Sequence, residues 1–289
     1  SETDTRIATT DALADHGHHA PTLAMPDAGT GHDAGVATWI TKEAGNRRMP
    51  YERERLERAI DRVHAEFPQL EVDDFKRSVF GFVERKEAVN ADDLVDHLIR
   101  EAEARVDLAA PEWEHFAARI YLRRLYKRAS RNRFYDAEQK YGSYVGLQES
   151  LADRNIYSND ILRAYSKEEL EQAGRMIDPG RDRLFTYNGL YLLATRYLAT
   201  DNARNVYELP QERWLTIALY LMQNEGGTGQ GGRERRMQLV GEAYWALSNL
   251  YMTVATPTLQ NAGKVGGQLS SCFIDTVDDS LQGIYDSNT

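Results

Sequence analysis

Apolar residues recur at spacings of three and four through much of this chain, which is the pattern of amphipathic helices. Four such stretches lie between residues 51 and 130, and the first three carry the apolar sets Leu56, Ile60, Val63 and Phe67, then Phe75, Val79, Phe82 and Val83, then Leu94, Val95, Leu98 and Ile99. The fourth has Pro111 in its first turn and ends in a basic cluster suited to a helix C-terminus. The pattern predicts four helices.

Two short strands are expected before these helices. Residues 36–41 alternate between apolar and polar positions, residues 43–46 read Glu-Ala-Gly-Asn and favour a turn, and residues 47–50 can pair back as a second strand. The sequence therefore predicts a compact unit over residues 36–130, in which a small sheet caps four helices.

Residues 131–253 read as almost entirely helical, because apolar stripes run through 188–200, 209–224 and 235–255. We expect the aromatic residues of this region to pack in a core: Tyr187, Tyr191, Tyr197, Trp214, Tyr220, Tyr244, Trp245 and Tyr251. A glycine-rich stretch over 226–235 follows no predicted strand and lacks the Lys-Ser or Lys-Thr ending of a phosphate-binding loop. It is interpreted as a flexible connector.

The pattern changes after residue 253. Residues 256–268 have the composition of a loop, and residues 269–277, which read LSSCFIDTV, favour a buried strand. The sequence stops soon after this first strand, and a sheet with one strand has no partner. We therefore expect an incomplete domain, either a fragment or one half of a split protein.

Composition narrows the class of protein. With 42% hydrophobic and 28% charged residues among 289, the chain resembles a soluble globular protein, and its net charge of −10 argues against nucleic acid as a partner. No apolar run is long enough for a membrane span and no signal peptide is evident, so a cytoplasmic location is expected. Residues 1–35 are predicted to be a disordered tail. Its histidines, His16, His18, His19 and His32, are not expected to hold a metal.

Several rare features near the C-terminus agree in spacing: Thr256-Pro257, Gln-Leu-Ser-Ser-Cys over 268–272, and Asp-Asp-Ser-Leu over 278–281. Together they resemble the large (alpha) subunit of class I ribonucleotide reductase. The resemblance implies a mainly α fold with small β elements: an ATP cone over 36–130, a helical segment over 131–253, and the start of a ten-stranded α/β barrel over 254–289.

The resemblance also implies roles for individual residues. Cys272, the only cysteine, matches one member of the dithiol that supplies two electrons to the substrate. Thr256 and Ser271 match substrate-binding positions, and Asp279 and Ser280 match the start of the specificity site for an effector nucleotide. The plainer alternatives are an inert buried cysteine for Cys272, a turn residue before proline for Thr256, and an ordinary helix N-cap for Asp279 and Ser280.

The cone of this family grips the phosphates and base of ATP or dATP with polar and basic residues. The positions that match this effector site are Lys42, Glu52, Arg55, Arg124 and Lys127. Three positions depart from the pattern: Met49 replaces a polar residue, Glu52 adds negative charge beside phosphates, and Val95 stands where some members have a polar residue. Because each lost ligand weakens triphosphate binding, the resemblance leaves open whether this cone still senses dATP.

As a whole, the resemblance implies the N-terminal part of a ribonucleoside-diphosphate reductase, inactive alone. Its implied effectors are ATP, dATP and other deoxynucleotides, and its metal would belong to a radical-generating beta subunit, with none in this chain. Implied partners are the remainder of the alpha subunit, the beta subunit, a second alpha subunit, and thioredoxin or glutaredoxin as reductant. Two alternatives remain: a fragment of an adenosylcobalamin-dependent (class II) reductase, and a non-catalytic nucleotide-sensing scaffold. A cone-containing repressor is disfavoured, because its zinc ribbon needs four cysteines.

Overall fold

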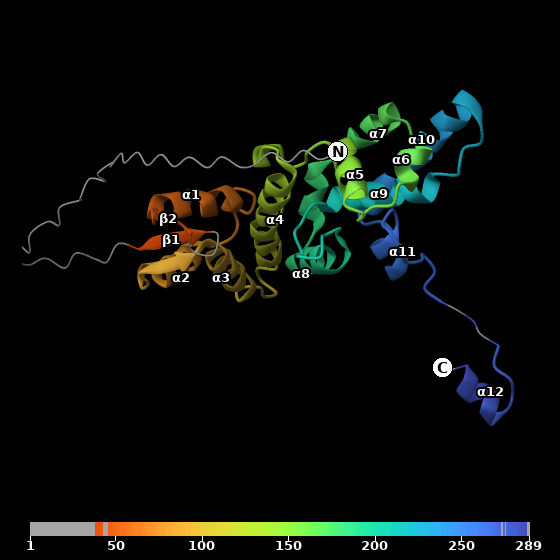
Figure 1. Cartoon of the computed structure of the whole chain (residues 1–289). Coiled ribbons are helices and arrows are strands. Elements are labelled where there is room, and N and C mark those ends of the chain that lie inside the picture. The colour runs from red at the N-terminus through yellow and green to blue at the C-terminus, as the bar shows by residue number, and fades with distance from the viewer. Residues whose placement is uncertain (1–37, 43–45, 273, 275, 288–289) are drawn as a thin grey trace, which may run out of the picture. The chain divides into compact units, whose positions relative to one another are not determined.

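The computed structural model of the chain describes residues 38–42, 46–272, 274 and 276–287 (Figure 1). The expected tail over 1–35, with its four histidines, lies outside the described residues, as does most of the turn between the first two strands. No helix in the described ranges is both long and apolar enough to cross a membrane.

A three-stranded sheet opens the described chain. Strand β1 (Trp39–Lys42) lies in the centre, antiparallel to β2 (Arg47–Pro50) and parallel to β3 (Ala88–Asn90). Ile40 is opposite both Met49 and Val89, so the apolar positions of the three strands are in register. The first two strands confirm the prediction. The third was missed because it has three residues and runs directly into the N-cap of the next helix.

The four predicted helices are present as α1 (Arg53–His64), α2 (Asp73–Glu84), α3 (Ala91–Glu103) and α4 (Glu112–Arg133). Their apolar faces meet around Phe75 and Phe116, whose rings lie 5.3 Å apart. The Asn90 side chain caps α3 by accepting a hydrogen bond from the backbone N–H of Asp92 at 2.8 Å. Helix α1 ends before Phe67, which is nevertheless buried, and Val95 is only half-buried.

Most of residues 137–248 lie in helices, as expected, although residues 198–209 are not helical. The elements are η2 (Ala137–Gln139), α5 (Tyr144–Asp153), α6 (Asp160–Ala164), α7 (Lys167–Gly174), η3 (Pro179–Leu184), α8 (Tyr187–Leu192), the π-helical η4 (Leu193–Tyr197), α9 (Pro210–Met222) and α10 (Gly229–Ser248). Helix α9 is buried along most of its length and packs against α10. Helix α4 extends past the predicted boundary at residue 130 and packs against α8, so it belongs to both halves of the described chain.

Two local predictions about loops are wrong. The glycine-rich stretch is a connector only up to Thr228, because α10 starts at Gly229 and includes the remaining glycines. Gly227 of the connector and Gly232 of the helix approach so closely that a Cβ on Gly232 would lie 2.5 Å from the carbonyl oxygen of Gly227. Residues Thr256–Asn261 form a short helix, α11, because Pro257 is favoured in a first turn.

The aromatic prediction holds only in part. Trp214 and Tyr244 are buried, whereas Tyr191, Trp245 and Tyr251 are exposed. Among the described residues of 269–277 no strand forms, since a strand needs a hydrogen-bonded neighbour and none of the described segments pairs with this one. A final helix, α12 (Leu281–Asp286), follows.

Candidate functional site

Basic side chains gather around a cavity of about 480 Å³ lined by β1, α1, α3 and α4. Among its described lining residues the cationic ones are Lys42, Arg55, Arg62, Arg123, Arg124, Lys127, Arg128 and Arg131, and the one carboxylate is that of Asp92. Apolar residues, among them Val95, Leu98 and Phe116, complete the lining. Excess positive charge beside an apolar surface suits a ligand with both phosphates and an aromatic base.

The cations of this cavity differ in the hydrogen bonds and ion pairs that they already form within the protein. Arg124 donates to the carboxylate of Asp96 at 2.6 Å and to the backbone oxygen of Asp92 at 3.0 Å. Within the described part of the chain, Lys127 and Arg123 form no ion pair with a carboxylate. Burial, followed by repulsion from Arg123 and Lys42, lowers the pKa of Lys127. Burial and Arg62 likewise lower the pKa of Arg123. An anion in the cavity would relieve both effects.

The structure brings together four of the five residues that sequence reasoning assigned to the cone effector site, namely Lys42, Arg55, Arg124 and Lys127. Glu52 does not line this cavity; it lies with Arg55 and Arg62 around a neighbouring open hollow. The carboxylate therefore does not face the space where phosphates would be held.

Four cations of the cavity were not singled out from the sequence: Arg62, Arg123, Arg128 and Arg131. Two of these, Arg128 and Arg131, recur with Arg124 and Lys127 at spacings of three and four along α4, which places them on one helix face. This periodicity was the available signal. It was overlooked because a basic helix end has a simpler explanation in the helix dipole.

The segment that contains Cys272 is tied to helix α11. Thr258 Oγ1 donates to the backbone oxygen of Leu269 at 3.1 Å, and Asn261 Nδ2 donates to that of Gln268 at 2.9 Å. Thr256 is exposed in the first turn of this helix. The Cys272 thiol is exposed, 3.7 Å from Ser271 Oγ. The substrate-binding roles of Thr256 and Ser271 stay predictions.

The turn after α11 is anchored to the helical core. Gly263 has a φ of +76°, and a Cβ at this position would lie 2.7 Å from Thr216 Cγ2 of α9. The backbone N–H of Ser158 donates to the oxygen of Gly263 at 2.9 Å, and Lys264 Nζ donates to the oxygen of Tyr197 at 2.6 Å. Burial lowers the pKa of Lys264 to about 8. These contacts fix the position of α11.

A buried ion pair lies directly beneath this turn. Arg213 and Glu208 are fully buried and approach to 3.4 Å, and Arg213 also donates to the backbone oxygen of Ala262. Glu208 accepts further hydrogen bonds from the Tyr157 hydroxyl and, at 2.9 Å, from the backbone N–H of Ala199. The pair therefore joins α9 to the segment that leads to Cys272.

A second buried carboxylate links α4 to the helical region. Asp182 of η3 accepts hydrogen bonds from the hydroxyls of Tyr126 at 2.5 Å and Tyr141 at 2.8 Å, and from Gln211 Nε2 at 2.8 Å. Burial raises the pKa of Asp182 to about 6, although these hydrogen bonds oppose the shift. Tyr126 lies on α4, so this network connects the helix that lines the cavity to the core around α9.

The raised pKa of Asp182 predicts a pH dependence of stability. Since the pKa is higher in the folded than in the unfolded chain, the stabilisation is complete below about pH 4 and is lost as the pH rises through 6. The unfolding free energy of the parent should fall between pH 4 and pH 7. In Asp182→Asn this fall should be smaller by an amount on the order of 2 kcal/mol. Urea unfolding at several pH values measures this. An unchanged pH profile in the variant would contradict the assignment.

The predicted specificity-site residues lie at the start of α12. Ser280 Oγ accepts a hydrogen bond from the backbone N–H of Gly283 at 3.0 Å, so the side chain acts as the N-cap of this helix. Asp279 and Ser280 are both exposed. The N-cap alternative is thus observed for Ser280, and the effector role of the two residues stays a prediction.

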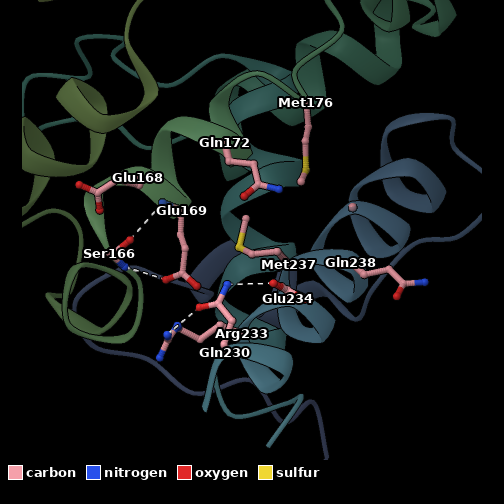
Figure 2. A pocket seen from close by; sticks show the side chains of 11 residues that line it. Ser166, Glu168, Glu169, Gln172, Met176, Gln230, Arg233, Glu234, Met237 and Gln238 are labelled. Carbon is pink, nitrogen blue, oxygen red and sulfur yellow. Dashed lines mark hydrogen bonds between the residues drawn. The ribbon is translucent and has the colours of Figure 1, made fainter. Parts of the chain in front are cut away.

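An open groove of about 560 Å³ between α7 and α10 contains none of the predicted site residues (Figure 2). Its polar side chains bond to one another: Ser166 and Glu169 form a capping box, and Arg233 donates to Gln230 at 2.9 Å. Figure 2 shows Met176 and Met237 between the two helices. Its charged lining residues are Glu168, Glu169, Glu234 and Arg233, so the groove has no excess of positive charge, in contrast to the cavity beside α4.

Comparison with known proteins agrees with this architecture. Residues 183–267 match the family described as the ribonucleotide reductase all-alpha domain. The ribonucleoside-diphosphate reductase subunit alpha of Treponema pallidum is 37% identical over 221 residues, covering 76% of this chain and 25% of the relative. The Helicobacter pylori (strain ATCC 700392 / 26695) subunit is 31% identical over 202 residues, covering 70% and 24%. The Escherichia coli ribonucleoside-diphosphate reductase 1 subunit alpha is 27% identical over 199 residues, covering 68% and 25%.

The fold and these matches show that the chain belongs to the ribonucleotide reductase family. Within that family, it corresponds to the N-terminal part of the alpha subunit. The chain spans about a quarter of the length of the curated relatives that it matches.

Proposed function

We propose that the chain is the N-terminal, nucleotide-regulated part of a ribonucleoside-diphosphate reductase of class I, which converts ribonucleotides to deoxyribonucleotides. The observation that carries the proposal is the cavity beside α4, where four residues assigned from sequence alone to an effector site face one space. The names of the relatives, ribonucleoside-diphosphate reductase subunit alpha, support the activity and the two-subunit organisation.

In this proposal the cavity binds ATP or dATP as an allosteric effector. Lys42, Arg55 and Lys127 compensate the charge of the triphosphate, while the apolar lining around Leu98 and Phe116 accommodates the base. A cationic cluster with few anions is stabilised when phosphate oxygens enter, so binding and local order are linked. Asp279 and Ser280 contribute to a second effector site for deoxynucleotides, at an interface between two alpha subunits.

Cys272 serves as one thiol of the reducing pair. Loss of the substrate 2'-hydroxyl as water takes two electrons and two protons, and two thiols supply them by forming a disulfide. Thioredoxin or glutaredoxin then reduces the disulfide. The second thiol belongs to the remainder of the alpha subunit, and a metallocofactor in the beta subunit supplies the radical. An exposed thiol suits this exchange and a reducing, cytoplasmic location.

Removing one cation from the cavity should weaken effector binding. We expect Lys42→Gln to raise the Kd for ATP roughly 10- to 100-fold, because a hydrogen bond between charged groups contributes about 1.5–3 kcal/mol. Equilibrium titration of the chain with ATP and dATP measures the effect. Lys167→Gln, which removes an exposed lysine of α7 outside the cavity, is the matched control. Equal affinities for the parent and Lys42→Gln would refute the role of the cavity.

A further inference from the structure

A second cation-rich cavity, of about 220 Å³, adjoins the first. It is lined by α1, α4, η2 and η3, and its described cations are Arg62, Arg119, Arg123, Lys127, Lys140 and Arg183. Two carboxylates, those of Glu66 and Glu138, line it as well. The positive charges thus exceed the negative ones by four, and Arg62, Arg123 and Lys127 line both cavities.

Arg119, which lines this cavity, has one donor that the described part of the protein leaves unpaired. Its Nε donates to Glu66 at 2.8 Å and one terminal nitrogen donates to the backbone oxygen of Arg183 at 3.0 Å. The other terminal nitrogen is buried and has no hydrogen-bond partner among the described residues. The Arg119 side chain is 10% exposed, so an unpaired donor there is costly unless an acceptor enters.

The remaining charges leave room for an anion. Glu66 is shared between Arg119 and Arg183, which it meets at 2.8 Å and 3.5 Å. Lys140 and Arg183 are exposed at the edge of the lining, where they can attract an anion from solution. The lowered pKa values of Arg123 and Lys127, which result first from burial, agree with a cluster that lacks a counter-charge.

From these contacts we propose that the cavity between α1, α4, η2 and η3 is a phosphate-binding site, distinct from the nucleotide cavity beside it. Its ligand is a phosphate-type oxyanion, either free phosphate or the phosphate tail of a nucleotide. The Arg119 guanidinium and the side chains of Lys140 and Arg183 hold the oxygens. Because η3 carries both Arg183 and the buried Asp182, the site lies where α4 meets the helical region. The inference does not depend on nucleotide binding in the first cavity.

Calorimetric titration of the chain with inorganic phosphate tests the proposal. The double variant Lys140→Gln/Arg183→Gln removes two cations that line this cavity and not the first. It should bind phosphate roughly tenfold more weakly or worse. Lys167→Gln on α7, outside both cavities, should bind phosphate as the parent does.

A variant that is expected to bind phosphate more tightly tests whether weaker binding in the double variant results only from misfolding. Glu138→Gln removes a carboxylate that lines the cavity, so it should tighten phosphate binding roughly two- to tenfold. Titration with ATP separates the two sources of the ligand. A second ATP per chain that is lost in the double variant indicates a nucleotide tail, whereas one ATP per chain indicates free phosphate. Absence of saturable phosphate binding, or its loss in Lys42→Gln but not in the double variant, overturns the proposal.

Discussion

Arg213→Met is expected to lower the free energy of unfolding by about 3–5 kcal/mol, because it leaves the buried carboxylate of Glu208 without its cation. The variant also removes the donor that binds the backbone oxygen of Ala262. The turn that holds α11 should therefore loosen together with the core. Urea unfolding at pH 7 measures the first effect, and hydrogen exchange of residues 262–266 measures the second.

Two further variants make this prediction specific. Arg235→Met breaks an ion pair with Glu242 at 3.8 Å in which both side chains are more than half exposed, so it should change stability by less than about 1 kcal/mol. The double variant Arg213→Met/Glu208→Gln removes both buried charges and should recover part of the loss. A loss in Arg213→Met no larger than that in Arg235→Met would show that the pair does not stabilise the core.

Cys272→Ser is expected to abolish repeated turnover when the chain is combined with the rest of the alpha subunit and a beta subunit. A hydroxyl cannot form a disulfide, so the two electrons for each substrate would have no source within the alpha subunit. Thr253→Ser, an exposed substitution in the segment that precedes α11, should leave turnover unchanged and serves as the control. Deoxyribonucleotide formation measured over many cycles, with thioredoxin as reductant, gives the readout. A serine variant as fast as the parent would remove Cys272 from the dithiol.

Helical periodicity predicted much of this fold, because burial of an apolar face is what selects these elements. The stripe of Leu56, Ile60 and Val63 became the buried face of α1, and the aromatic stretch after Pro111 became α4. The same logic failed where one contact decides the structure. Strand β3 exists because Val89 pairs with Ile40 of a segment nearly fifty residues earlier, which no local pattern reveals.

The candidate site was predictable to the extent that charge type and spacing encode it. Lys42 and Lys127 were placed in one effector site by resemblance, and both line one cavity in the structure. The orientation of Glu52 could not be predicted in this way, since the residue at the N-cap of α1 can face either side of the helix. Buried ion pairs such as Arg213 with Glu208 could not be predicted either. A charged residue is expected to be solvent-exposed unless its tertiary neighbours are known.

The most direct test of the account is reconstitution of the reductase from its parts. The chain is mixed with the remainder of the alpha subunit, a beta subunit, ATP and thioredoxin, and the conversion of a ribonucleoside diphosphate to its deoxy form is measured. We expect product only when the chain and the beta subunit are both present. Product formed with adenosylcobalamin in place of the beta subunit, or none in a complex that binds ATP in the cavity beside α4, would contradict the class I assignment.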